Sequence, residues 1–231
     1  MANRRALVTG SARGTGAQVA SRLSESGFEV IGVDVLEQEI GTVDLAIQAD
    51  LGNPDDCARV LDQVREVDVL VNAHGLLEPR SIDEVTVKDF DRAMSVNLRS
   101  VFLLCQGLAP GMGAKGWGRI VNFSSVVART GGKTSAPYAA SKAGVIAITK
   151  SFASVFARQG VTCNAVAPAA IDTQLNAFLD DTARQAIIDA IPIGRFSTSE
   201  EFAALVMYLV SEESGFITGA TIDMNGGWVM A

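Results

Sequence analysis

Short apolar runs alternate with longer amphipathic segments along the whole chain. The runs are rich in Val, Ile and Ala and end at Gly, Asn, Asp or Ser, which is typical of strands buried on both faces of a parallel sheet. They predict strands at residues 6–9, 28–34, 45–49, 67–72, 118–125, 161–166 and 220–224. In a chain of 231 residues this alternation indicates one α/β domain.

The segments between these runs place apolar residues at helical spacing. Asn53 and Pro54 give one clear helix start, an N-cap followed by a proline in the first turn. The connection between 34 and 45 holds Gly41 and leaves room only for a truncated crossover helix. Residues 172–193 are helical but poorly anchored, so we expect a mobile flap over the site. The other predicted helices span 17–26, 55–66, 86–108, 136–158 and 199–209.

Glycines punctuate the turn between the first strand and the first helix. Gly10 permits a tight turn, while Gly14 and Gly16 permit close approach of a pyrophosphate and of helix to strand. The helix N-terminus adds free N–H groups and the positive end of a dipole. The second strand ends at Asp34, which either caps a loop or accepts hydrogen bonds from an adenosine ribose. We therefore predict a dinucleotide site, although the spacing G-x-x-x-G-x-G differs from the usual G-x-G-x-x-G.

Tyr138 and Lys142 lie four residues apart near the start of the helix at 136–158. At this spacing a phenol and an ammonium group project from the same helix face. A free phenol titrates at about 10, and a neighbouring cation would lower that pKa. The pair indicates a general acid–base site, with an ordinary half-exposed helix face as the alternative for the pair taken alone.

Other polar residues fall at strand ends or interrupt a helix. Ser125 ends the strand at 118–125, the end at which doubly wound sheets present their chemistry. Asn97 interrupts the apolar helix at 86–108, where it is either solvated or used. His74 is the only histidine, and no carboxylate or serine lies at a motif-like spacing from it. We assign it a structural or cofactor-lining role in preference to a catalytic one.

Charge and cysteine content argue against several classes of function. The net charge of -7 and the pI of about 4.8 disfavour binding to nucleic acid or to anionic membranes. No run approaches the ~18 apolar residues of a membrane span, and the first strand leaves no room for a signal peptide, so we expect a cytoplasmic protein. Cys57, Cys105 and Cys163 are widely spaced in apolar settings, which predicts buried free thiols and no metal site.

In their order and spacing these motifs resemble the short-chain dehydrogenases/reductases over essentially the whole chain. The catalytic residues of that family, an Asn-Ser-Tyr-Lys tetrad, match Asn97, Ser125, Tyr138 and Lys142. Its cofactor-binding motifs match TGxxxGxG at 9–16, an adenine-contacting Asp-Leu pair, an NNAG strand end and a segment contacting the nicotinamide carboxamide. The cofactor-binding residues so implied are Gly10, Arg13, Gly14, Thr15, Gly16, Asp34, Asp50, Leu51, Asn72, Gly75, Tyr138, Lys142, Pro168, Ile171 and Thr173.

The resemblance implies a Rossmann-type doubly wound sheet of seven parallel strands in the order 3-2-1-4-5-6-7, with helices on both faces. The cofactor half would span about 1–125 and the catalytic and substrate half about 126–231. The implied reaction is hydride transfer between a nicotinamide cofactor and a secondary alcohol or ketone. Tyr138 would carry the hydroxyl proton, Lys142 would lower the tyrosine pKa and hold the nicotinamide ribose, and Ser125 would hydrogen-bond the carbonyl oxygen. Asn97 would position a water that links Lys142 to solvent.

The ending at 217–228 looks most like that of 3-oxoacyl-carrier-protein reductases and their relatives that act on other alcohols. Departures from the family pattern limit transfer of a substrate. The NNAG motif reads Asn-Ala-His-Gly, so the hydrogen bonds of its second Asn must be replaced, and Ala169 stands where the family has a glycine, at a cost in backbone freedom. Two rival functions stay open: a non-catalytic NAD-binding sensor or scaffold, and an epimerase or lyase on the same fold. Ketone turnover distinguishes these rivals from an oxidoreductase.

Asp34 predicts NAD in preference to NADP, because a 2′-phosphate would meet its carboxylate as a like charge. Arg13 competes with this prediction, since it could offset part of the repulsion. The loops at 76–81, 128–136 and 172–193 would shape the small-molecule substrate site. We also expect a homo-oligomer, a tetramer by resemblance, in which the helices at 86–108 and 136–158 pair with symmetry mates and the apolar tail at 226–230 is covered.

Overall fold

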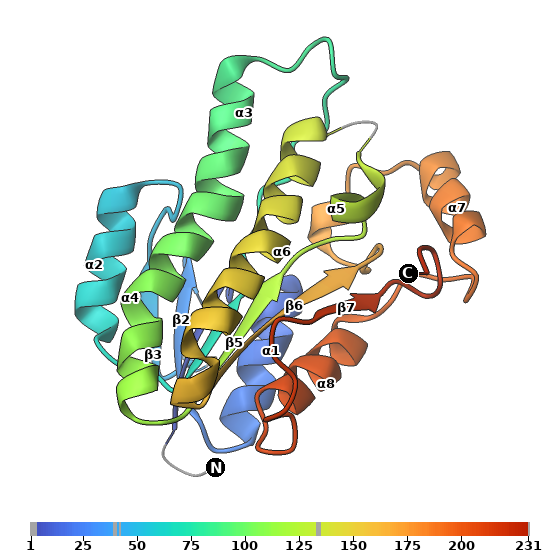
Figure 1. The fold of residues 1–231 in the computed structure, drawn as a ribbon. Coiled ribbons are helices and arrows are strands. Elements are labelled where there is room, and N and C mark those ends of the chain that lie inside the picture. The colour runs from blue at the N-terminus through green and yellow to red at the C-terminus, as the bar shows by residue number, and fades with distance from the viewer. Residues whose placement is uncertain (1–3, 39–40, 42, 133–134, 231) are drawn as a thin grey trace.

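Seven parallel strands form one sheet in the order β3-β2-β1-β4-β5-β6-β7, with helices on both faces (Figure 1). The structure is a computed structural model that describes residues 4–38, 41, 43–132 and 135–230. The predicted fold class and strand order are confirmed. The strands are β1 Arg5–Thr9, β2 Glu29–Asp34, β3 Leu45–Gln48, β4 Val69–Asn72, β5 Gly118–Phe123, β6 Val161–Pro168 and β7 Thr221–Met224.

The helices cover the sheet in two layers, with α2, α4 and α6 on one face and α1 and α8 on the other (Figure 1). None of the helices in the described ranges is long and apolar enough to cross a membrane. The α-helices are α1 Gly14–Glu25, α2 Pro54–Val64, α3 Val87–Met94, α4 Ser100–Ala114, α5 Val127–Thr130, α6 Ala136–Phe156, α7 Asp181–Ala190 and α8 Ser199–Leu209. Short 3-10 turns lie at Ala157–Gln159 and Gln174–Asn176.

Side chains of each central strand alternate between two apolar cores. Leu7 of β1 and Leu70 of β4 pack in the core under α2, α4 and α6. Val8 and Val71, the next residues, pack in the core under α1 and α8. This alternation follows from the pleat of a strand, and it explains why each strand reads as a continuous apolar run.

A π turn, Ser95–Arg99, joins α3 to α4 where the sequence predicts one uninterrupted helix at 86–108. Thr86 starts the helical stretch with a capping box to Asp89. At the end of the turn, the Ser100 N–H bonds to the Ser95 carbonyl, five residues back. Such turns insert a residue into a helix and recur at functional sites.

Two connections between strands, at 35–44 and 172–193, contain little helix. In the described part of 35–44, between β2 and β3, no helix forms; residues 39, 40 and 42 of this predicted truncated crossover lie outside the described residues. The predicted flap at 172–193 is helical only in its 3-10 turn and in α7, and α7 has no buried residue. Whether this flap moves stays a prediction.

Candidate active site

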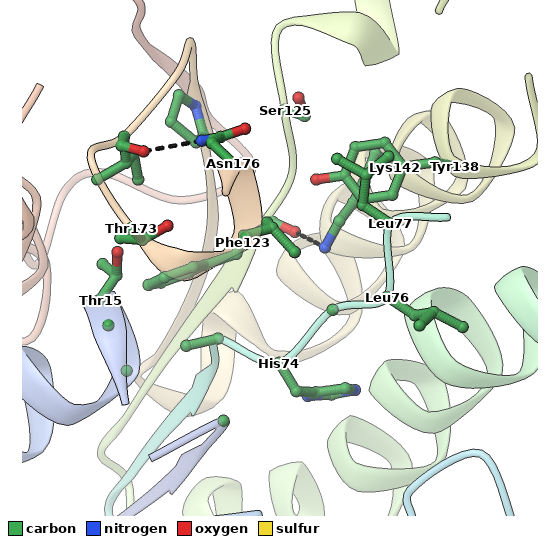
Figure 2. Close-up of a pocket in the computed structure, with 18 of the residues that line it drawn as sticks. Thr15, His74, Leu76, Leu77, Phe123, Ser125, Tyr138, Lys142, Thr173 and Asn176 are labelled. Atoms are coloured by element: carbon green, nitrogen blue, oxygen red, sulfur yellow. Dashed lines mark hydrogen bonds between the residues drawn. The ribbon is translucent and has the colours of Figure 1, made fainter. Parts of the chain in front are cut away.

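A cleft of about 450 Å³ opens at the carboxyl ends of the parallel strands. Its walls come from the loops that follow β1, β2, β4, β5 and β6, together with the first turns of α6 and the flap (Figure 2). Ligands bind at this edge in doubly wound sheets. All the predicted site residues line the cleft except Asn72 and Asn97. In the loop at 128–136, residues 133 and 134 lie outside the described part of the chain.

The glycine turn after β1 packs directly against the end of β4. Gly10 has a φ of +70°, and a Cβ there would lie 2.8 Å from the His74 Cα, so the position admits only glycine. A Cβ on Gly16 would lie 2.0 Å from the Gly10 carbonyl oxygen. No side chain caps the start of α1. The first N–H groups of α1, which lie at the cleft, are therefore available to bind an anion.

Backbone amides hold the Asp34 carboxylate at the far end of the cleft. One oxygen accepts a hydrogen bond from the Ala12 N–H at 3.0 Å, and the other accepts from the Leu36 N–H at 2.9 Å. Asp50 follows β3 at the same end and accepts from the Gly52 N–H at 2.9 Å. Arg13 lies exposed at the rim of the cleft. This end of the cleft thus has two carboxylates held by backbone amides, those of Asp34 and Asp50, and the exposed guanidinium of Arg13.

Lys142 reaches from α6 to the end of β5. Its Nζ donates to the Phe123 carbonyl oxygen at 2.7 Å and lies 5.7 Å from the centre of the Tyr138 ring (Figure 2). Gly75 lies beside the amine, and a Cβ there would be in ordinary contact with Nζ at 3.5 Å. Ser124 donates to the Lys142 carbonyl oxygen at 2.9 Å, which ties α6 to β5.

Burial dominates the protonation of this pair. It raises the pKa of Tyr138 to about 12, with hydrogen bonding to Ser125 acting in the opposite sense, and it lowers the pKa of Lys142 to about 8. The expected net lowering of the tyrosine pKa does not appear in this structure, because burial outweighs the other influences on Tyr138. The ammonium group donates to a backbone carbonyl and not to the phenol, so desolvation outweighs its charge. Tyr138 therefore carries its proton at neutral pH.

Asn72 and Asn97, both predicted as site residues, do not line the cleft. Asn72 follows Val71 in β4, and strand alternation turns its side chain toward α4, where Nδ2 donates to Asn122 at 2.8 Å. Its Oδ1 is buried without a partner among the described residues. Asn97 lies in the π turn and holds the loop after β4: Oδ1 accepts from the Leu76 N–H at 2.7 Å and Nδ2 donates to the Leu76 carbonyl at 2.9 Å. Its role in positioning a water stays a prediction.

His74 lines the cleft but uses both ring nitrogens for internal hydrogen bonds. Nδ1 lies 2.6 Å from the Thr9 hydroxyl, and Nε2 lies 2.7 Å from the Ser100 hydroxyl and 3.0 Å from the Val96 carbonyl. Burial and the nearby charge of Lys142 lower its pKa to about 3. The imidazole is therefore neutral, which suits a structural or cofactor-lining role.

Sequence reasoning named the loops that carry most of the substrate side of the cleft but not the side chains that line it. Phe178 and Leu175 of the flap line it although their side chains are 49% and 43% exposed. Trp228, from the C-terminal segment, packs against the small apolar cluster under the flap. These residues lie outside the regular helices and strands, so no hydrophobic periodicity in the sequence identifies them as lining a site. The other apolar side chains on this side are Leu76, Leu77, Val127 and Ile187.

Ala169 adopts an ordinary backbone conformation. Among the described residues, Arg65 is the only one other than glycine with a positive φ. Ala169 therefore fits here without backbone strain, and the expected cost in backbone freedom stays a prediction. No group of three or more His, Cys, Asp or Glu side chains in the described ranges is arranged to hold a metal ion.

Comparisons with known proteins agree with this geometry. The family model described as enoyl-(acyl carrier protein) reductase matches residues 10–229. The 3-oxoacyl-[acyl-carrier-protein] reductase FabG of Vibrio cholerae is 38% identical over 236 residues, covering 97% of both chains, and that of Escherichia coli is 35% identical with the same coverage. A Beutenbergia cavernae structure described as an NAD(P)-dependent gluconate 5-dehydrogenase, with bound NADP at low occupancy, matches with a TM-score of 0.95 and 32% identity, covering 99% of this chain and 97% of that one.

Replacing Lys142 with Met should stabilise the cofactor-free protein at pH 7. The pKa of Lys142 is about 8 when folded against an ordinary 10.5, so the unfolded chain binds more protons between these values, and wild-type stability rises with pH through that window. The variant lacks this rise, so its advantage should shrink toward pH 10.5. Thermal denaturation of both proteins from pH 7 upward measures this difference in stability. Lys150→Met, at an exposed position of α6, is the control. A difference that does not change with pH would refute the argument.

Proposed function

Because the chain belongs to the short-chain dehydrogenase/reductase family, and is therefore an NAD(P)-dependent oxidoreductase of ketones and secondary alcohols, we propose that Tyr138 carries the proton of that reaction. The observation that carries the proposal is the meeting of Tyr138, Lys142 and Ser125 in one cleft with the glycine turn. No other tyrosine lines this cleft among the described residues.

The residues present fit a nicotinamide dinucleotide. Gly10 and Gly16 keep side chains away from the uncapped N-terminus of α1, which suits a pyrophosphate. Asp34 offers a fixed carboxylate to an adenosine ribose, and Lys142 offers an ammonium group at the nicotinamide end. When bound, the nicotinamide supplies or accepts the hydride.

In ketone reduction, Tyr138 donates its hydroxyl proton to the carbonyl oxygen. Its pKa of about 12 keeps that proton in place in the cofactor-free protein. Ser125 donates a hydrogen bond to the same oxygen, where negative charge develops. Lys142 adds a positive charge that favours the phenolate formed after transfer. In alcohol oxidation the same groups work in reverse.

The substrate side of the cleft favours a ketone with an apolar body. Leu76 and Leu77 line one wall, while Leu175 and Phe178 of the flap line another. An apolar substrate would cover the half-exposed flap residues, whereas a polyhydroxylated substrate would lose water without gaining partners there. Ketones with alkyl, acyl or ring substituents are therefore the first compounds to test. A cytoplasmic location stays a prediction.

Tyr138→Phe should lower kcat by at least ~100-fold, because the variant lacks the proton that the carbonyl oxygen must receive. NADH binding, followed by fluorescence titration, should survive. Tyr208→Phe, which changes the only other tyrosine at an exposed position on α8, is the matched control. Retention of a tenth or more of the wild-type rate would refute the assignment. A wild type that binds NADH but reduces no ketone would favour the sensor, scaffold, epimerase or lyase alternatives.

We further propose that NAD is preferred over NADP. At ~5 Å and an effective dielectric constant of about 20, each charge of a 2′-phosphate near the Asp34 carboxylate costs roughly 3 kcal/mol. Asp34 is held in place by the Ala12 and Leu36 amides, whereas Arg13 is exposed and can turn into solvent.

The Asp34→Ser variant should shift the ratio of kcat/KM for NADH and NADPH toward NADPH by tenfold or more, which corresponds to about 1.4 kcal/mol. Arg13→Ala is the matched variant and should shift the ratio the other way. Both ratios are measured with one ketone. A wild-type preference for NADPH would show that Arg13 or another group sets the choice.

We also propose a homotetramer. Phe102 of α4 and Phe152 of α6 pack with tilted rings whose centres lie 5.9 Å apart, and Phe152 stacks on Phe156. Val155, on the same helix, is 63% exposed. An apolar face of this kind is stabilised when another copy covers it. Light scattering at micromolar concentration should give about four times the chain mass of 24.2 kDa; a monomeric mass would exclude the proposal.

A further inference from the structure

The side chain of His74 lies between the end of β1 and the π turn and forms hydrogen bonds to both. The proposed proton transfer by Tyr138 does not use it. On one side its Nδ1 meets the Thr9 hydroxyl at the end of β1. On the other side its Nε2 meets the Val96 carbonyl and the Ser100 hydroxyl at the π turn. The preceding residue, Ala73, offers no polar side chain.

The hydrogen bonds around His74 define its tautomer. The Thr9 hydroxyl accepts from the Ala73 N–H at 3.1 Å, and its own hydrogen can go to His74 Nδ1 at 2.6 Å or to the Val71 carbonyl at 3.4 Å. The shorter contact favours Nδ1 as the acceptor, so Nε2 carries the hydrogen and can donate to the Ser100 hydroxyl at 2.7 Å and to the Val96 carbonyl at 3.0 Å. Burial, and after it the charge of nearby Lys142, lowers the histidine pKa and keeps the ring from taking a second proton.

The π turn contains the acceptor that His74 uses. In a regular α-helix the Ser100 N–H would bond to the Val96 carbonyl, four residues back. Here it bonds to the Ser95 carbonyl instead, so the Ser100 N–H does not occupy the Val96 oxygen. The Ser100 hydroxyl donates to that oxygen at 2.5 Å and His74 Nε2 donates at 3.0 Å. The Val96 oxygen thus accepts from two side chains.

The residue after Val96 transmits this contact toward the catalytic lysine. Asn97 holds both backbone groups of Leu76 and donates to the Ser141 hydroxyl at 3.1 Å. Ser141 precedes Lys142 on α6. A shift of the π turn would therefore move the loop after β4 and the first turns of α6 together.

We propose that His74 is a positioning residue. Its Nε2–H bonds to the Val96 carbonyl and the Ser100 hydroxyl, a contact that we call the latch, and so holds the π turn in place. Asn97 of that turn then fixes Leu76 and Ser141 beside Lys142. The kinetic consequence rests on the proposed hydride transfer. The latch itself can be measured without turnover.

Two isosteric replacements separate the two ends of the latch. In His74→Asn the amide lies where Nδ1 lies and reaches only Thr9, whereas in His74→Gln the amide N–H lies near the place of Nε2 and can reach Val96. His74→Ala removes both contacts. The Asn and Ala variants should lose about tenfold in kcat per NADH-binding site with KM for NADH changed less than about twofold, while the Gln variant keeps more than about half of kcat.

Hydrogen exchange measures the latch directly. The Asn and Ala variants should exchange faster than wild type at Leu76 and through residues 95–101, while the Gln variant should not. Peptides from 199–209 are the internal control, because α8 packs on the other face of the sheet from α4 and the π turn. Ser100→Ala, which removes the second donor to Val96, should loosen the same segment.

Equal loss of kcat in the Asn and Gln variants, or unchanged exchange at 95–101 in His74→Ala, would overturn the proposal. A uniform fall in melting temperature across all variants, with kcat per NADH-binding site unchanged, would also overturn it, since that outcome describes a merely structural residue. If wild type reduces no ketone but the exchange pattern holds, hydride transfer fails as the function and the latch stands.

Discussion

The ammonium group of Lys142 is buried beside a backbone carbonyl and not beside a carboxylate, and this constraint governs the groups around it. The carbonyl of Phe123 offers a dipole, so the charge remains costly and the pKa falls to about 8. The neighbouring histidine is kept neutral in part by the same charge. Tyr138 stays protonated because burial raises its pKa to about 12. The cleft therefore contains one unneutralised cation next to a proton donor, which suits chemistry that leaves a transient negative charge.

Much of this molecule could be predicted from local patterns. Strands buried on both faces give apolar runs, so the sheet, its resemblance-based order and the turn at Gly10 and Gly16 are as expected. The family resemblance, built on the spacing of residues such as Tyr138 and Lys142, is confirmed. Side-chain direction was not predictable: Asn72 turns toward α4 because of its register in β4. The π turn was hidden as well, since it depends on contacts that Asn97 makes with residues distant in sequence.

The loops of the substrate side could be named from the sequence, but their lining side chains could not, because the packing of this side is separate from the sheet. Ala170, Ile191 and Phe196 form a small cluster of their own, and Trp228 packs against it. A segment held by so few buried contacts opens at lower free energy than the sheet does. The shape of the substrate site can therefore vary while the cores under the two helix layers, and the cofactor end that they support, stay the same. This separation is why the fold constrains the reaction more tightly than it constrains the substrate.

The choice of histidine for the contact to the π turn follows from the charge of Lys142. A lysine or arginine at this position could donate to the Val96 carbonyl but would add a second buried cation near the first. A neutral imidazole donates to the same oxygen and accepts from Thr9 without any charge. Its rigid ring also holds the two contacts in opposite directions, which limits the rotamer freedom that a flexible amide would lose on folding. Because the charge of Lys142 is buried, a neutral imidazole at His74 is a better donor to the neighbouring π turn than a second cation would be.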